Sequence, residues 1–166
     1  AKALKLSTST VSRALRDSYE INAETKRMVQ EYATKMNYRP NPIAQGLKEN
    51  RSRAIAVIVP EIANNFFSEA ITGIEDVANN LGYDVVIFQS HESYDKEVAN
   101  VRNVVARRVD GLLISISNQT KDVSHLSDLH ERGFPLVFFD RVSDEIDTYK
   151  VVADNFSGAF MATDHL

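Results

Sequence analysis

Apolar residues form two different patterns in the two parts of the chain. In the second part, four short apolar and β-branched runs follow one another at similar intervals, and they are AIAVIV at 54–59, YDVVIFQ at 83–89, GLLISI at 111–116 and PLVFFD at 135–140. The runs are continuous rather than alternating, which is typical of strands buried on both faces of a sheet. We therefore predict four strands at these positions.

The segments between these runs predict helices over 68–81, 94–108 and 122–132. Gly82 and Gly133 follow two of them, and glycine commonly ends a helix because it adopts the left-handed conformation without strain. Strands that alternate with helices indicate an α/β fold with a doubly wound parallel sheet.

The first part of the chain is predicted to be helical, beginning with LSTSTVSRAL at 6–15. On a helical wheel one face of this segment carries short polar side chains and two arginines, and its members are Thr8, Ser9, Ser12, Arg13 and Arg16. The other face is apolar. Ser7 suits the N-cap position, so the helix is predicted to begin at Thr8.

Two further helices are predicted around this one. AKAL at 1–4 is interpreted as the end of a preceding helix, and Asn22 as the cap of a third helix with Glu24 in its first turn. Helix, tight turn, helix and supporting helix is the order of a helix-turn-helix, whose second helix enters the major groove of DNA. The alternative is a surface helix in a generic bundle.

The segment NPIAQGLKEN at 41–50 predicts a helix of unusual weakness. Asn41 suits an N-cap and Pro42 a first helical residue, but few residues follow and Gly46 lies among them. A helix this short does not persist alone in water.

Charge is divided unevenly along the chain, whose net charge is -4. Residues 1–53 hold 11 Lys and Arg against 5 Asp and Glu, whereas the remainder holds 8 against 18. A basic head on an acidic body is typical of nucleic-acid-binding proteins. The longest apolar run is too short to span a bilayer and no leader opens the chain, so we expect a soluble cytoplasmic, nucleoid-associated protein without a membrane partner.

Residues for catalysis or metal binding are not found in any recognisable pattern. The chain has no cysteine, and its histidines are scattered at His91, His125, His130 and His165. His125 and His130 are expected on an exposed helix. No phosphate-binding glycine loop or G-x-S-x-G motif occurs. We expect no enzyme, no cofactor and no metal.

The stretches KLSTSTVSRALRD and INAETKRMVQEYATKMNYRPNPIAQGLKENRS resemble the DNA-binding head and hinge of the lactose-repressor (LacI/GalR) family, and the resemblance continues to the last residue. It implies a helix-turn-helix DNA-binding domain over 1–39 with a truncated first helix, a hinge helix and linker over 40–52, and an effector-binding core over 53–166. This core resembles the N-terminal subdomain of periplasmic binding proteins. It is expected to be incomplete, because the family's core has two subdomains that close on the ligand.

The resemblance also implies which residues contact DNA. Base readers fall on Thr8, Ser9 and Arg13, of which Arg13 can donate two hydrogen bonds to guanine O6 and N7. Phosphate contacts fall on Ser7, Thr10, Ser12 and Asn22, for which helix capping is the alternative.

In the hinge, the resemblance places Ala44, Leu47 and Lys48 in the minor groove. Leu47 matches a leucine that wedges into the central base step, and Ala44 matches a small residue against the groove floor. A core leucine is the alternative for Leu47.

Ligands of doubly wound sheets bind beyond the carboxyl ends of the strands. The loops after the first and fourth predicted strands, PEIANNFF and DRVS, resemble those of sugar-binding relatives, and the implied effector contacts are Asn64, Phe66, Phe67, Asp140 and Arg141. Aromatic rings stack on sugar C–H groups, and the polar side chains bond hydroxyls. Alternatively, Phe66 and Phe67 anchor a helix in the core, and Asp140 and Arg141 form an ion pair in a turn.

These features together predict a homodimeric repressor that binds a palindromic operator in double-stranded DNA and responds to a small-molecule effector, a sugar or sugar derivative. Two alternatives remain open. One is a regulator of the catabolite-control branch of the family, modulated by a phosphorylated protein partner. The other is a solute-binding protein with no role on DNA.

Overall fold

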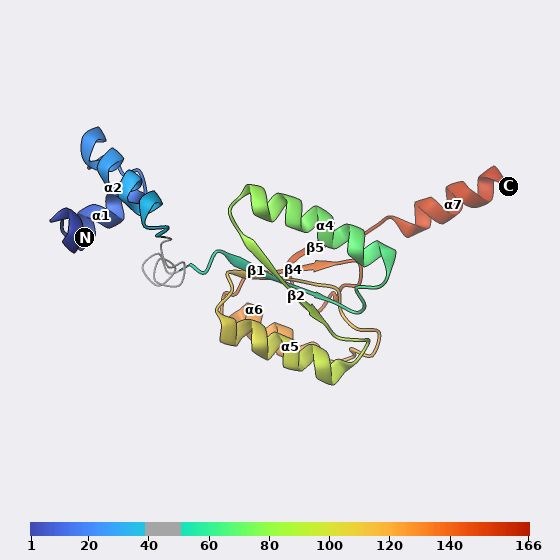
Figure 1. Cartoon of the computed structure of the whole chain (residues 1–166). Helices are drawn as coiled ribbons and strands as arrows, with labels where there is room; N and C mark the ends of the chain where they lie inside the picture. Colours follow the sequence, from blue (N-terminus) through green and yellow to red (C-terminus); the bar gives the residue numbers. More distant parts are fainter. Residues whose placement is uncertain (39–50) are drawn as a thin grey trace. The chain divides into compact units, whose positions relative to one another are not determined.

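The computed structural model describes residues 1–38 and 51–166, and the chain divides into two compact units, Ala1–Gln45 and Gly46–Leu166 (Figure 1). The predicted hinge residues Ala44, Leu47 and Lys48 lie outside the described residues. The boundaries predicted for the three segments therefore stay predictions.

In its described residues, 1–38, the first unit contains η1 (Lys2–Leu4), α1 (Thr8–Leu15) and α2 (Ala23–Lys35). The predicted start of α1 at Thr8 is confirmed, because Ser7 Oγ accepts a hydrogen bond from the Thr10 amide at 3.0 Å. The predicted cap of α2 is confirmed as well, since Asn22 Oδ1 accepts one from the Thr25 amide at 2.7 Å.

The segment at 1–4 differs from the prediction in helix type. Lys2–Leu4 form a 3₁₀ turn in which the Leu4 amide donates to the Ala1 carbonyl at 3.2 Å. Bonds between residues three apart are the ones that so short a segment can close. Lys5 ends the turn in the left-handed conformation, with φ 52°.

Packing in the first unit joins the two α-helices through small and branched residues. Ala14 of α1 and Val29 of α2 are 0% and 1% exposed. Between the helices, Lys26 Nζ lies 2.8 Å from Asp17 Oδ1 and also donates to the Asp17 carbonyl at 3.1 Å. This double contact ties the intervening turn to α2.

Five parallel strands form the sheet of the second unit in the order β2-β1-β3-β4-β5, and they are β1 (Ala54–Val59), β2 (Asp84–Gln89), β3 (Gly111–Ile114), β4 (Leu136–Phe139) and β5 (Tyr149–Val151). The doubly wound parallel sheet and its four predicted strands are confirmed. Strand β5 was not predicted, because its three residues, Tyr-Lys-Val, contain no apolar run.

The helices of the second unit are α4 (Asn65–Asn80), α5 (Tyr94–Arg107), α6 (Ser124–Glu131) and α7 (Asn155–His165). Helix α4 covers one face of the sheet, and α5 and α6 cover the other (Figure 1). The predicted helix ends at Gly82 and Gly133 are confirmed, since these residues have φ values of 74° and 78°. Helix α4 begins earlier than predicted because Asn64 caps it.

Strand β1 is buried on both sides, as its continuous apolar sequence predicts. Ala56 and Ile58 belong to the core cluster that contains residues of α5 and α6. Val57 and Val59 belong to the cluster that contains Phe67 and Ile71 of α4. Alternate residues of one strand therefore supply two cores.

A buried carboxylate connects three segments on the α5 side of the sheet. The Glu97 side chain is 0% exposed and accepts hydrogen bonds from the Ser117 amide at 2.6 Å and from Thr120 Oγ1 at 3.0 Å. His125 Nε2 lies 3.0 Å from Glu97 Oε1, and this histidine side chain is 9% exposed. The prediction that His125 is a surface residue is therefore wrong, because this carboxylate gives it a partner inside the protein.

Replacing Glu97 should strongly destabilise the second unit. We expect Glu97→Ala to lower the free energy of unfolding by about 3 kcal/mol or more, because several buried donors lose their acceptor. Urea unfolding at neutral pH measures the change.

The adjacent Lys96→Ala serves as the control, since Lys96 is exposed on the same helix. Its effect should stay within about 0.5 kcal/mol. Equal effects of the two substitutions would contradict the role of the Glu97 network.

Candidate functional site

The exposed face of α1 carries the three residues predicted to read bases. Thr8, Ser9 and Arg13 are all exposed, whereas Ala14 on the opposite face is fully buried. Short side chains near the start of the helix allow its backbone to come close to a binding partner. Together with the exposed Arg16 at its C-cap, the helix thus presents a surface of hydroxyls and two guanidinium groups.

Two of the four residues predicted to contact phosphates, Ser7 and Asn22, cap helices. Ser7 Oγ lies 2.8 Å from Ser9 Oγ and 2.8 Å from Thr10 Oγ1, in addition to capping α1. Asn22 caps α2, and Ser12 is partly buried. In this structure Ser7 and Asn22 thus act as helix caps, and their contacts with phosphate stay predictions.

Arg13 has an acidic partner that the sequence did not suggest. Its Nε lies 3.1 Å from Glu20 Oε2, and the two side chains are 50% and 47% exposed. Glu20 lies in the turn between α1 and α2. About half of each side chain is therefore open to solvent.

A second group of candidate residues gathers at the carboxyl edge of the sheet, beyond the ends of β1 and β4. Asn64 caps α4 by accepting a hydrogen bond from the Phe66 amide at 2.9 Å. Phe66 is 50% exposed, but Phe67 is only 3% exposed and its ring lies edge-on to Phe139 with 6.4 Å between centroids. Phe67 therefore anchors α4 in the core, which was the alternative to effector contact, whereas Phe66 remains accessible.

Asp140 and Arg141 follow β4 at the same edge. Asp140 has φ 60°, and its Oδ2 accepts a hydrogen bond from Ser115 Oγ at 3.2 Å. Arg141 Nη1 lies 2.8 Å from each carboxylate oxygen of Glu92. Arg141 is thus held by the loop that follows β2.

Glu92 is a site residue that sequence reasoning missed. Its Oε2 also accepts a hydrogen bond from the Asn118 amide at 2.9 Å. Partial burial by itself raises the pKa of Glu92, but the Asn118 amide and the Arg141 guanidinium outweigh it and hold the pKa below the ordinary value. The fold class could have indicated Glu92, because β2 lies beside β1 in the sheet and the loop that follows β2 therefore lies at the same edge as the loop that follows β1.

The carboxyl edge carries more negative than positive side chains. Glu61, Glu92 and Asp140 lie in its loops together with Arg141, and His91 Nδ1 lies 3.1 Å from Glu61 Oε2. Such a set can both donate to and accept from hydroxyl groups. It is poorly suited to a phosphate, which would compete with Glu92 for the guanidinium.

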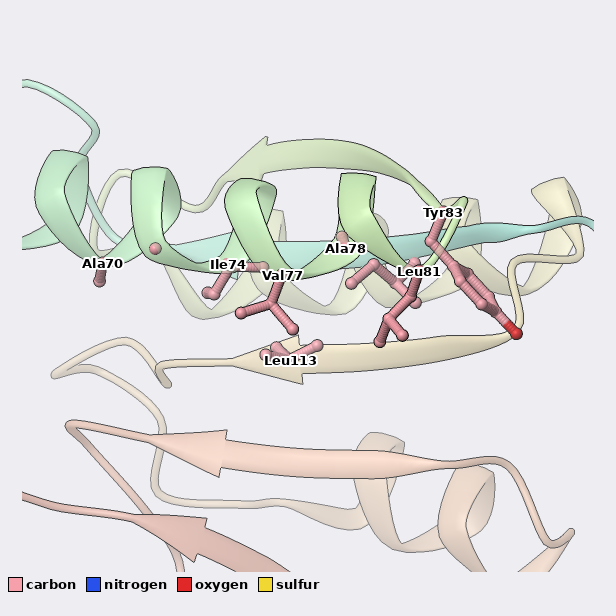
Figure 2. Close-up of a pocket in the computed structure, with 9 residues that line it drawn as sticks. Ala70, Ile74, Val77, Ala78, Leu81, Tyr83 and Leu113 are labelled. Carbon is pink, nitrogen blue, oxygen red and sulfur yellow. The ribbon is translucent and has the colours of Figure 1, made fainter.

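A separate apolar groove of about 500 Å³ runs along α4 (Figure 2). Its lining includes Ile74, Val77 and Leu81 of α4 and Leu113 of β3. None of the five predicted effector contacts is among its lining residues. The lining is mainly aliphatic, and beside the Tyr83 hydroxyl it offers few of the hydrogen-bonding groups that a sugar needs.

Neither a metal cluster nor a membrane helix is found in the part of the chain that the structure describes. Within residues 1–38 and 51–166 no three metal-ligating side chains come together. No helix in those ranges has the length and apolar content needed to cross a membrane.

Two family models match the chain in succession. Residues 1–41 match the model of bacterial regulatory proteins of the lacI family, and residues 55–166 match a periplasmic binding protein domain. By the longer match the chain belongs to the periplasmic binding protein domain family, and its head is a domain of the lacI family of bacterial regulatory proteins. Its lacI-family head coincides with α1 and α2, and its binding-protein domain with the parallel sheet.

Curated relatives match the chain along nearly its full length. The repressor CytR of Escherichia coli K12 is 35% identical over 163 residues, which cover 98% of the chain and 47% of CytR. Catabolite control protein A of Priestia megaterium is 30% identical over 166 residues, covering 100% of the chain and 49% of that protein. The chain thus spans about half the length of these curated relatives.

Solved structures give the same picture of the fold. The lac repressor dimer bound to operator and the anti-inducer ONPF matches with a TM-score of 0.82 and 26% identity. The match covers 99% of this chain and 50% of that one. The predicted resemblance to the lactose-repressor family is confirmed.

The Glu92 pair should make stability depend on pH in the acid range. A carboxyl whose pKa is lower in the folded state stabilises the fold above its ordinary pKa, and this contribution disappears as the pH falls through the lowered value. We expect Glu92→Gln to cost up to about 1 kcal/mol at pH 7 and progressively less below about pH 4.5.

Chemical denaturation of the intact protein at pH 7 and in the acid range measures this difference. Glu69→Gln on the exposed surface of α4 is the control and should show no such pH dependence. A constant cost of Glu92→Gln at every pH would refute the assignment.

Proposed function

We propose that this chain belongs to a transcriptional regulator, a repressor that binds a palindromic operator in double-stranded DNA as a homodimer. The observation that carries the proposal is the exposed polar face of α1, presented by a lacI-family head that precedes a periplasmic-binding-protein domain. Proteins similar to this chain along its length are named as transcriptional repressors, which supports the same function. A regulator of this kind acts on bacterial DNA and needs no catalytic residues.

In this proposal, α1 enters the major groove with Thr8, Ser9 and Arg13 toward the bases. Arg13 donates two hydrogen bonds to guanine O6 and N7, which is the strongest base discrimination available to these three residues. The hydroxyls of Thr8 and Ser9 bond either bases or phosphates. Ser7, Thr10 and Asn22 lie at or near helix starts, where backbone amides also favour phosphate, whereas Ser12 lies in the middle of α1 and would contact phosphate through its hydroxyl.

The hinge completes the proposed contact with DNA. Ala44, Leu47 and Lys48 bind in the minor groove, where the Leu47 side chain wedges between base pairs and Lys48 neutralises phosphate. We propose that the short hinge helix, which is not stable alone in water, folds only on DNA, and that part of the binding free energy is used to fold it. Its formation therefore depends on the spacing of the two hinges in the dimer.

We further propose a small hydroxylated effector at the carboxyl edge, contacted by Asn64, Phe66, Asp140 and Arg141. Phe67 supports this site by packing edge-on against Phe66, with 5.2 Å between ring centroids. The surplus of carboxylates favours a neutral sugar over a phosphorylated one. Effector binding changes the core and thereby the separation of the hinges, which couples the two sites.

A second candidate function has one observation in its favour. The relative from Priestia megaterium is a catabolite control protein, and it matches the whole chain. A regulator of that branch would be modulated by a phosphorylated protein partner rather than by a sugar. A solute-binding protein without a role on DNA is disfavoured by the lacI-family head.

Removing the Arg13 side chain should relax base preference. We expect Arg13→Ala to cost about 1 to 3 kcal/mol against the palindromic duplex that the intact protein selects from a randomised pool, and much less against random duplex. Fluorescence anisotropy at one fixed salt concentration measures both affinities.

Arg27→Ala is the matched control, since it removes one positive charge from the exposed side of α2. It should not change the ratio of the two affinities. If the intact protein prefers no duplex over any other, the proposed function itself is wrong.

Asp140→Asn should weaken effector binding at the carboxyl edge. Thermal unfolding of the intact protein against neutral mono- and disaccharides, sugar phosphates and nucleosides first identifies a ligand, because a hundredfold excess over Kd stabilises by about 2.7 kcal/mol. For the neutral sugar that we expect, Asp140→Asn should weaken binding by about tenfold or more.

Asp144→Asn is the control, because Asp144 is 97% exposed and pairs with Lys150. Stabilisation by sugar phosphates alone would contradict the preference for a neutral ligand. A panel without any ligand would favour the protein-partner alternative.

A further inference from the structure

The turn between α1 and α2 brings a carboxylate to the side of Arg13. Glu20 Oε2 lies 3.1 Å from Arg13 Nε, and both side chains are about half exposed. Glu20 is the seventh residue after Arg13, so the pair is made by the fold of the turn and not by neighbouring positions of one helix.

The contact uses one particular nitrogen of the guanidinium. Arginine carries five N–H donors in a rigid plane, of which Nε contributes one and the terminal nitrogens four. A carboxylate at Nε leaves the two terminal nitrogens to donate side by side to guanine O6 and N7. The ion pair and the base contact are therefore compatible.

The turn that carries Glu20 is itself held in place. The Ser18 amide donates to the Arg13 carbonyl at 3.1 Å, and the Glu20 amide donates to Ser18 Oγ at 3.4 Å. On the other side, Lys26 holds Asp17 through its carboxylate and its carbonyl. These bonds give Glu20 a defined position relative to α1.

A carboxylate beside a DNA-binding arginine also has a cost in affinity. DNA is densely negative, so a negative side chain near the contact surface weakens binding to every sequence alike. Holding the arginine in one orientation strengthens binding only to a sequence that places a guanine where the guanidinium points. The two effects act in opposite directions on affinity for the matching sequence, and only the orientation of the arginine raises selectivity.

We propose that Glu20 is a positioning residue that orients the Arg13 guanidinium for guanine and raises discrimination between DNA sequences at the expense of general affinity. This inference rests on the proposed function, since it requires that α1 reads bases. It adds a residue outside the recognition helix to the determinants of specificity.

The test compares two variants that each remove one negative charge from the same turn. Glu20→Gln removes the negative charge beside Arg13 but keeps an acceptor oxygen, and Asp17→Asn removes the negative charge beside Lys26. Asparagine tolerates the φ of 55° at position 17. Glu20→Ala removes the acceptor altogether. All are made in the intact protein, and melting temperatures show that each variant folds.

The readout is the ratio of affinities for two duplexes at fixed salt concentration. The first duplex is the selected palindrome. The second is the same palindrome with one G·C pair replaced, and that pair is the one whose replacement weakens binding of the intact protein but not of Arg13→Ala. We expect Glu20→Gln and Glu20→Ala to lower this ratio by about two- to fivefold, the range for an exposed ion pair, while binding to random duplex tightens. Asp17→Asn should tighten binding to random duplex and leave the ratio unchanged.

Two results would overturn the proposal, and they are distinguishable. If Arg13→Ala lowers the ratio but the Glu20 variants do not, Glu20 does not position Arg13 and the proposed function stands. If Arg13→Ala leaves the preference for every base pair unchanged, base reading by Arg13 fails and the inference fails with it.

Discussion

The arrangement of the second unit depends on burying both faces of β1. A central parallel strand with apolar side chains on both sides requires covering helices on both faces, which α4 supplies on one side and α5 and α6 on the other. Parallel pairing also directs every strand the same way, so the loops that follow β1 to β4 all begin at the carboxyl edge of the sheet. The candidate effector residues are neighbours there for this reason, although Asn64 and Arg141 are far apart in sequence.

Each candidate site contains an arginine paired with a carboxylate from another segment. Arg13 is paired with Glu20 in the head, and Arg141 is paired with Glu92 in the core. In each pair a carboxylate from another segment orders a long, flexible side chain before any ligand arrives, which reduces the entropy lost on binding. The carboxylate also lowers the net positive charge beside each arginine, and we propose that each site thereby selects its ligand by geometry more than by charge.

Much of the fold follows from local signals in the sequence. Continuous apolar runs located four strands, and capping side chains located the starts of α1 and α2. The signals failed where tertiary contacts decided the outcome. Strand β5 has no apolar run and forms by pairing with β4, and the His125 side chain is only 9% exposed because Glu97 offers it a partner.

The sequence by itself determined the family, the order of head and core, and the residue types available on α1 and at the carboxyl edge. These depend on motifs and periodicity, which are local properties of the chain. Only the tertiary structure decided which arginine pairs with which carboxylate, and that Phe67 is buried while Phe66 is exposed. Such pairings join residues from different elements, and their geometry is set by how the chain packs rather than by the spacing of residues along it.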